Sequence, residues 1–502
     1  MLLFAAAAFT PVAHASDTQP APRPPSKSFG RTNSQPPRQS DWQPVVAGRL
    51  KNGLRFAIMP RKSNEAGIGL LARNEGGFIA EQRPGERGLA HLIEHLFLVS
   101  PTANAPDDAN HFLRIGLPLT FSAPSAGTTS WRETNLFVST KTRHQADLDT
   151  LLALFRETLT QLSFRADIVD EQRADVMREM AGRWLGNDIY ASYIAAAAPG
   201  SPTDVIDAQN SDDVPGATIE TIRQLYRRLY RPENIMIVIV GNVDPAATTA
   251  LIQKQFGNWE DTGPVPTRPT VSAFRPQEIA PISYSSRAEG RRIAMITIAS
   301  ETPPPPSTRG RQTDEMLMDM LALRAVNNRL ANAQPASPPG KVGFFIENGE
   351  QGHRLLLLWD NFAADEWRPA IVGLTRMTCA LGTIGFSASE WTVAKQNLID
   401  DLDNQTKAMA SVPNVEVAKD LSHAIATGRG LIPPNELLGR ARKLLPGISL
   451  QAGNDWWRQQ WHAGVEHIRV ESPELGSVGD QLAAIRATID DAVGDGRCKV
   501  RP

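Results

Sequence analysis

The chain has 502 residues, of which 41% are hydrophobic and 21% are charged, and its formal net charge is −2. This length exceeds what one hydrophobic core usually holds, so two or more domains are expected. The near-neutral charge gives no reason to expect nucleic acid or an anionic membrane as a partner, and the body of the chain has no apolar run long enough to span a bilayer.

The N-terminus predicts export. Residues 1–15 read MLLFAAAAFTPVAHA, an apolar run that ends in the small-x-small pattern cut by signal peptidase, although no Lys or Arg precedes it. We interpret it as a signal peptide with an atypical start and expect a periplasmic or secreted protein. Residues 16–44 are rich in Pro, Ser, Gln and Arg, so we expect a disordered linker there.

The cysteines are too few for a disulfide framework. Only Cys379 and Cys498 occur, and they lack the spacing of a metal site. In an oxidising compartment they can pair with each other. Two unrelated thiols are an equally good interpretation of the sequence.

Strands and helices alternate in the first half of the chain. Two short strands are expected in 48–60 around the Asn52-Gly53 turn, and a third in 67–73. Apolar spacing then predicts further elements in chain order: helices at 89–98, 146–162, 166–184 and 218–230, a strand at 235–240 and a helix at 245–256.

The second half of the chain shows a similar alternation of strands and helices. Residues 261–272 are rich in Pro and Thr and are interpreted as a linker between the halves. The elements expected after it are strands at 292–299, 353–359 and 465–470 and helices at 311–330, 367–381 and 387–404. The similar order suggests an internal duplication. We therefore predict an α+β fold of two similar halves, each a mostly antiparallel sheet packed with long helices, with domains at 45–260 and 273–502.

The strongest chemical signal is the segment His91-Leu92-Ile93-Glu94-His95. On a helix, His91 and His95 lie on one face one turn apart, where two imidazoles can bind one zinc ion. Glu94 can reach a water on that zinc without being a ligand, and can take its proton and later pass it to a leaving amine. Chance produces such a pattern in about one per hundred chains of this composition. A metal site is therefore favoured over a His pair that only belongs to the surface or the core.

The order HxxEH is the inverse of HExxH and marks the inverzincins. Together with residues 76–81 and 87–90, the segment resembles the pitrilysin/insulysin family of metallopeptidases, which includes mitochondrial processing peptidase. The resemblance implies one zinc ion per chain, with Glu179 as its third ligand. Gln172 stands where the family usually has a Glu, and the neighbouring Glu171 is the reserve candidate for either role. The long gap between His95 and Glu179 implies an insertion in 100–119.

Residues 126–134 resemble the family's edge strand, which pairs with the extended backbone of the substrate. The resemblance assigns this role to Ala126, Gly127, Thr128 and Thr129, with Ala126 in place of the usual Asn. The family's second half often supplies an Arg and a Tyr that help to hold substrate. No Arg occurs in 331–335 and no Tyr in 343–346, so the pair is expected to be missing or to come from a related chain in a homo- or heterodimer.

These observations predict a zinc metalloendopeptidase that hydrolyses peptides or unfolded segments through a zinc-bound water activated by Glu94. A second interpretation is a non-catalytic or partner-dependent subunit of a heterodimeric peptidase. Gln172 and the missing Arg/Tyr pair favour it, whereas the intact set of His91, Glu94 and His95 opposes it. A structural zinc protein is disfavoured, because structural sites are closed by four ligands that often include Cys.

Overall fold

The structure, a computed structural model, describes most of the chain from residue 44 onward. The described residues are 44–62, 67–107, 126–130, 132–140, 145–180, 211–260, 274–286, 292–301, 308–333, 341–348, 353–428 and 430–494. The predicted signal peptide, nearly all of the 16–44 linker, the 261–272 linker, most of the predicted insertion and Cys498 lie outside this set. Cys379 is disulfide-bonded, and Cys498, the one other cysteine of the sequence, lies outside the described residues.

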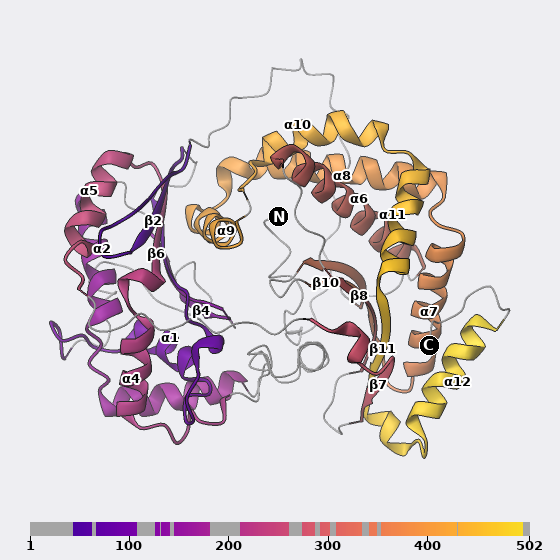
Figure 1. The fold of residues 1–502 in the computed structure, drawn as a ribbon, viewed down its shortest axis with the longest axis horizontal. Coiled ribbons are helices and arrows are strands. Elements are labelled where there is room, and N and C mark those ends of the chain that lie inside the picture. The colour runs from indigo at the N-terminus through magenta and orange to yellow at the C-terminus, as the bar shows by residue number, and fades with distance from the viewer. Residues whose placement is uncertain are drawn as a thin grey trace, which may run out of the picture.

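The first half is built on a six-stranded sheet of order β1-β2-β6-β3-β5-β4 (Figure 1). Only β2 and β6 run parallel, and the other neighbours are antiparallel. The strands are β1 (Val46–Arg49), β2 (Arg55–Pro60), β3 (Ile68–Asn74), β4 (Ala126–Thr129), β5 (Thr134–Ser139) and β6 (Ile235–Gly241). The helices are α1 (Leu89–Val99), α2 (Gln145–Thr160), α4 (Ile219–Leu229) and α5 (Pro245–Phe256), and residues 166–180 are also helical.

The second half is built on a five-stranded sheet of order β7-β11-β8-β10-β9. Its strands are β7 (Ile282–Ser285), β8 (Ile293–Glu301), β9 (Val342–Asn348), β10 (His353–Asn361) and β11 (Val465–Glu471). Its helices are α6 (Arg309–Ala333), α7 (Trp367–Thr383), α8 (Ala388–Ala408), α9 (Asn414–Ala426), α10 (Pro434–Leu444), α11 (Leu450–Ala463) and α12 (Gln481–Val493).

The two sheets follow one connection pattern. In both, the first strand of the pattern pairs in parallel with the last, as β2 does with β6 and β7 with β11. The last strand then pairs antiparallel with the second, the second with the fourth, and the fourth with the third. The predicted α+β fold of two similar halves is thus confirmed, with β1 as an extra edge strand in the first half.

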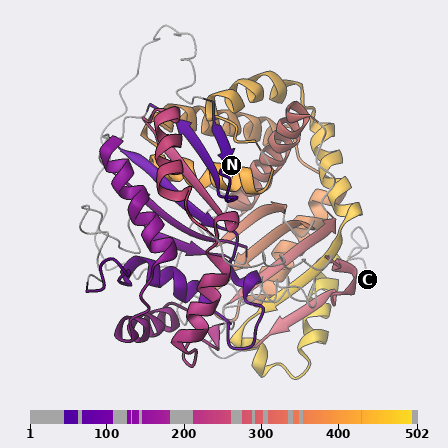
Figure 2. The same ribbon diagram turned by 60° about the vertical axis from the view of Figure 1, so that its left-hand side comes forward.

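Each sheet has an outer face covered by helices of its own half and an inner face turned toward the other half (Figures 1 and 2). In the first half, alternate strand residues such as Ile58, Leu70 and Ile237 join the large core under the helices. Their neighbours, such as Leu71 and Val238, belong to a second apolar cluster on the inner face. Burial on both faces explains why β3 and β6 are buried at every position rather than at alternate ones.

The inner face of the first sheet is covered by a helix from the second half, α9. Val415, Ala418 and Leu421 of this helix pack in the inner cluster with residues of β3, β5 and β6. The approach is close, because a Cβ added at Gly69 would lie 2.4 Å from the backbone of Asn414 and Val415. The domain boundaries predicted at 45–260 and 273–502 stay a prediction, and α9 shows that residues of the second interval complete the core of the first.

Among the described residues, no single helix is both long and apolar enough to cross a membrane. One bent pair, α7 with the segment Ala388–Ser411, meets the length and composition criteria together, at a bend of 101°.

Candidate metal centre and active site

The loop before α1 fixes where this helix begins. Gly85 and Gly88 have positive φ angles of 86° and 84°, which glycine adopts without strain. Gly88 offers no side chain to cap the helix, and the carboxylate of Glu81 takes that role: it accepts the N–H of Gly88 at 2.9 Å and that of Ala90 at 2.7 Å. A carboxylate at a helix N-terminus is favourable for the unpaired N–H groups and for the helix dipole.

Three potential metal ligands meet beside α1. His91 and His95 are both buried, and their rings lie edge to face with centroids 4.8 Å apart. Oε2 of Glu179, from the helix that covers 166–180, lies 3.2 Å from Nε2 of His95 and 3.5 Å from Nε2 of His91. Two ligands of one tetrahedral zinc ion stand about 3.4 Å apart, given metal–ligand bonds of about 2.1 Å. The distances from the carboxylate oxygen to the two nitrogens are thus close to the spacing of two ligands on one zinc ion.

Within the described residues, this is the one group of three or more His, Cys, Asp or Glu side chains close enough to hold a metal ion. Its potential ligand atoms all lie within 4.8 Å of one another. Two neutral imidazoles and one carboxylate are also the donor set of a catalytic zinc site, which leaves a fourth position open.

The other ring nitrogen of His95 is held by Gln172. Nδ1 of His95 lies 3.2 Å from Oε1 of Gln172, which is buried, and the amide nitrogen of Gln172 donates to Asp175 at 3.3 Å. Since Oε1 accepts, Nδ1 carries the proton, and Nε2, which faces Glu179 at 3.2 Å, is the ring nitrogen that can bind a metal. The reserve candidate Glu171 is exposed on the same helix and is not part of this arrangement.

Glu94 lies on the same helix but outside the ligand group. It is 4% exposed, and its Oε2 is 3.9 Å from Nε2 of His91 and accepts a hydrogen bond from Oγ1 of Thr129 at 2.9 Å. Burial raises the pKa of Glu94, while His91, His95 and the Thr129 hydroxyl oppose that rise. A carboxylate with a raised pKa is suited to accept and return a proton near neutral pH.

The strand β4 passes directly over Glu94. A Cβ at Gly127 would lie 2.4 Å from Cγ of Glu94, so glycine leaves the room that this side chain fills. Thr129 points to the same face as Gly127, whereas Thr128 points to the opposite face and is exposed. Ala126 is placed in the strand by its backbone alone.

The register of β4 shows which backbone groups face outward. Ser130 donates to the carbonyl of Glu133 at 2.8 Å, and Thr128 pairs with Asn135 two positions along. Hydrogen-bonded pairs alternate in an antiparallel ladder, so the N–H and C=O groups of Gly127 and Thr129 point away from β5. Since β4 is the last strand of the described sheet, these groups form its open edge, beside Glu94.

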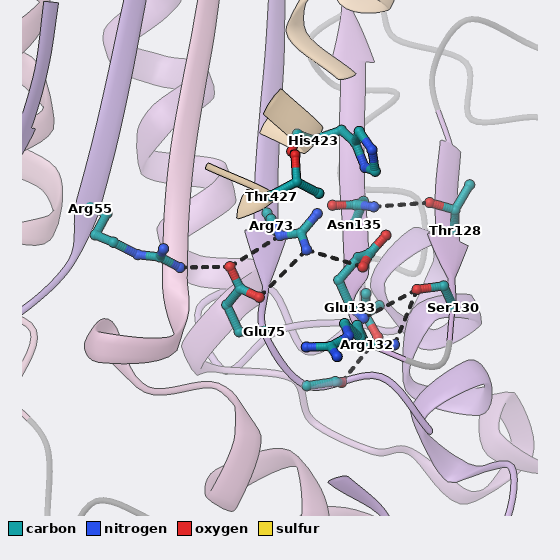
Figure 3. Close-up of polar contacts among 12 residues, drawn as sticks. Arg55, Arg73, Glu75, Thr128, Ser130, Arg132, Glu133, Asn135, His423 and Thr427 are labelled. Atoms are coloured by element: carbon teal, nitrogen blue, oxygen red, sulfur yellow. Dashed lines mark hydrogen bonds and ion pairs between the residues drawn. The ribbon is translucent and has the colours of Figure 1, made fainter. Parts of the chain in front are cut away.

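An ion-pair network around the buried Arg73 anchors the turn that joins β4 to β5 (Figure 3). On the inner face, Arg73 of β3 bonds to Glu75 at 3.1 Å and to Glu133 of the turn at 3.1 Å. Arg55 of β2 also binds Glu75, at 2.8 Å. The network therefore ties the β4–β5 hairpin to the centre of the sheet.

The sequence contains no Arg/Tyr pair at the positions where the family's second half often has one. The structure shows the role of the nearby Arg329 instead. This side chain binds the carboxylate of Glu390 at 2.7 Å and the carbonyl of Gly385 at 2.8 Å, so it supports the second half from within. Most of residues 331–340 lies outside the described set.

Sequence reasoning placed Thr129 on the substrate strand but missed its bond to Glu94, and it gave no role to Arg73 and Glu133. The spacing of residues 94 and 129 contains no periodic signal, so the contact depends on how β4 packs on α1.

Comparison with known families identifies the chain. Residues 76–192 match the model described as "Insulinase (Peptidase family M16)", and residues 216–357 match "Peptidase M16 inactive domain". Together these two matches cover more than half of the chain. The chain belongs to the insulinase family of peptidases. The predicted resemblance to this family is thereby confirmed.

Several relatives of the chain in the insulinase family are named zinc proteases. The chain is 21% identical over 425 residues to a probable zinc protease, PqqL, of Escherichia coli, an alignment that covers 83% of this chain and 45% of PqqL. It is 29% identical over 212 residues to the zinc protease PqqE of Helicobacter pylori, covering 41% of this chain and 45% of PqqE. The chain thus spans about half the length of the curated relatives it matches.

Solved structures of the family share the fold. The structure of the periplasmic protease PqqL from E. coli superposes with a TM-score of 0.71 at 20% identity, covering 89% of this chain and 50% of that chain. The structure of pitrilysin superposes with a TM-score of 0.60 at 14% identity, covering 91% and 49%. At these identities the likeness concerns the fold of the two halves.

Proposed function

We propose that this insulinase-family chain is a zinc metalloendopeptidase that hydrolyses peptides or unfolded segments. The observation that carries the proposal is the arrangement around α1: three zinc-compatible ligand atoms, a buried carboxylate beside them that is not a ligand, and an open strand edge passing over that carboxylate. The zinc protease names of the relatives support it.

In this proposal His91, His95 and Glu179 hold zinc. Zinc, when bound, supplies a Lewis acid that polarises a carbonyl and lowers the pKa of water. The outward N–H and C=O groups of Gly127 and Thr129 bind the extended peptide as an added strand, which places a scissile carbonyl next to Glu94. Glu94 takes the proton from the attacking water and passes it to the leaving amine.

Three further features belong to the proposal. The substrate is a peptide or an extended segment, because only an extended backbone can pair with a strand edge. Export to the periplasm agrees with PqqL being a periplasmic protease and with the apolar residues 1–15. A related chain in a homo- or heterodimer would supply the Arg and Tyr that residues 331–335 and 343–346 lack.

The test combines zinc content with cleavage of a quenched fluorescent peptide by wild type, Glu94→Gln and chelator-treated wild type. The proposal expects about one zinc per chain in wild type and in Glu94→Gln, with cleavage lost in the variant by about a thousandfold or more and lost on chelation. Residual cleavage near the wild-type rate in Glu94→Gln would remove Glu94 from the mechanism. Zinc without cleavage in wild type would favour the partner-dependent subunit, and no zinc at all would remove the ligand assignment.

A further inference from the structure

We propose that Thr129 is a positioning residue that holds the Glu94 carboxylate in the orientation from which it takes the proton. This inference rests on the proposed peptidase function and adds to it a residue that links the substrate strand to the general base. The hydroxyl of Thr129 donates to Glu94, and the backbone N–H and C=O groups of Thr129 lie on the open edge of β4.

The direction of the hydrogen bond follows from counting protons. The Thr129 hydroxyl lies 2.9 Å from Oε2 of Glu94 and 3.4 Å from Oγ1 of Thr134. Thr134 has the carbonyl of Gly76 as its acceptor at 3.3 Å. The single proton of Thr129 therefore goes to the nearer acceptor, a carboxylate, where a hydrogen bond is shorter and stronger than one between neutral groups.

Glu94 has little else to hold it in place. In the part of the chain that the structure describes, the Thr129 hydroxyl is the one hydrogen-bond donor to its carboxylate. On the side of β4, Gly127 offers Glu94 no side-chain group, and the Glu94 side chain fills the space that a Cβ there would take. The polar contact that orients this buried carboxylate therefore comes from Thr129.

The consequence of losing this bond is specific. The same Oε2 atom lies 3.9 Å from Nε2 of His91, a proposed metal ligand. Without the Thr129 donor, the carboxylate is free to turn toward the ligand group and act there as an acceptor or a further ligand. Thr129 thus keeps Glu94 in the role of base.

The substrate strand shares this residue. The antiparallel register turns the N–H and C=O groups of Thr129 to the open edge, while its side chain faces α1. A peptide bound to that edge would make hydrogen bonds with the backbone of Thr129, the residue whose hydroxyl orients Glu94. Substrate binding and orientation of the base are therefore linked through one strand position.

The experiment compares Thr129→Val, Thr129→Ser and a matched control, Thr140→Val, in the full chain with quantified zinc. Thr140 is a buried threonine at the far end of β5 whose hydroxyl accepts the N–H of Ile68 at 3.1 Å, so its loss has a comparable structural cost away from Glu94. We expect kcat of Thr129→Val to fall by about tenfold to a hundredfold, the value of a hydrogen bond to a charged group, with KM within about twofold and zinc unchanged. Thr129→Ser restores kcat, and Thr140→Val keeps it.

A second readout needs no turnover. Unfolding midpoints are measured for Thr129→Val, Glu94→Ala and the double variant, and the two changes are expected to be non-additive because they remove one shared bond. Additive midpoints, or wild-type kcat in Thr129→Val, would overturn the positioning role while leaving the peptidase intact. A wild-type chain that cleaves nothing would instead overturn the proposed function, and the positioning role with it.

Discussion

At the scale of single residues, the metal group depends on how each imidazole is oriented. His95 can present Nε2 to a metal because Nδ1 donates to Oε1 of Gln172 at 3.2 Å. A glutamate at this position would accept the same proton with a full negative charge and make the imidazole a more basic ligand. The neutral amide keeps the orientation and gives up that electrostatic gain, so the departure from the family pattern affects affinity more than geometry.

This argument predicts opposite effects of two substitutions. Gln172→Glu should raise the affinity for zinc, and Gln172→Leu should lower it by about tenfold to a hundredfold, the usual range for outer-shell partners. Affinity is measured by competition with a chromogenic chelator, which needs no activity. Glu171→Gln is the matched control, since Glu171 is exposed on the same helix and should leave affinity unchanged. Equal affinities across all four proteins would show that His95 needs no partner at residue 172.

The sequence could predict the members of the site better than their contacts. His91, Glu94 and His95 share one short helical motif, so their common face follows from helix geometry. The structure brings Glu179 to this face from a helix more than eighty residues later, and only the family resemblance pointed to it. The Thr129 hydroxyl and the Gln172 amide act through tertiary packing, for which no local pattern exists.

At the scale of elements, β4 is anchored through the turn that joins it to β5. Its last bond to β5 joins Ser130 to Glu133, and Glu133 is bound by Arg73 on the neighbouring strand β3. Arg73 is 3% exposed, and its partners Glu75 and Glu133 are 13% and 20% exposed, so the anchor is a network around a buried arginine rather than a surface pair. Buried pairs are costly to break because the remaining partner is left unpaired. The edge over Glu94 therefore gains its rigidity from the inner face of the sheet.

Acidification should weaken this anchor. Burial acts to raise the pKa of Glu75, but the charge of Arg73 and the hydrogen bonds from Arg55 and Arg73 outweigh it and hold the pKa below its ordinary value. The folded state then binds fewer protons than the unfolded state, so the stabilisation is complete above the unfolded pKa of about 4.3 and is lost as pH falls through the lower folded pKa.

The measurement is urea unfolding between neutral pH and about pH 3, a range that begins above the unfolded pKa and descends below it. Wild type should lose free energy of unfolding on acidification, and Glu75→Gln should show a smaller loss from a lower starting point. Glu278→Gln is the matched control, because Glu278 pairs with Arg275 at the surface, with both side chains more than half exposed. If Glu75→Gln and wild type have parallel pH profiles, the network does not carry the acid sensitivity.

The elements expected from the sequence are present, but in the second half six further elements were missed: β7, β9, α9, α10, α11 and α12. Helix α5 has the predicted bounds because a capping Asp244 and a proline at its first position mark the start. Strand β7 has four residues and α9 begins after Pro413 without a side-chain cap, so neither carries a clear start signal. The partner of α9 could not be predicted at all, because its apolar face fits a sheet of either half.

At the scale of the whole molecule, the two halves are joined through α9. The helix belongs by sequence to the second half and packs on the inner face of the first sheet (Figure 1). The junction is polar where α9 begins: Arg61, after β2, donates to the carbonyls of Met409 and Val412 and to Oδ1 of Asn414, and Asn414 donates to the carbonyl of Gly67. Arg61, a side chain of the first half, thus binds the segment of the second half from which α9 begins.

Replacing Arg61 should weaken the contact between the two halves at α9 before either half unfolds. Arg61 is 2% exposed, so Arg61→Met keeps much of the volume but removes the side-chain donor to three oxygen atoms, of which the Met409 carbonyl keeps the N–H of Val412. We expect a loss of about 2–4 kcal/mol in the free energy of unfolding. Hydrogen exchange should locate the effect, with faster exchange in α9 and in the inner-face strands β3 and β6 than in α12, which packs within the second half. Arg440→Met is the control, since Arg440 makes a half-exposed ion pair with Asp314 inside the second half. Uniform acceleration in all helices, or none in α9, would mean that the halves are held together by the apolar inner face alone.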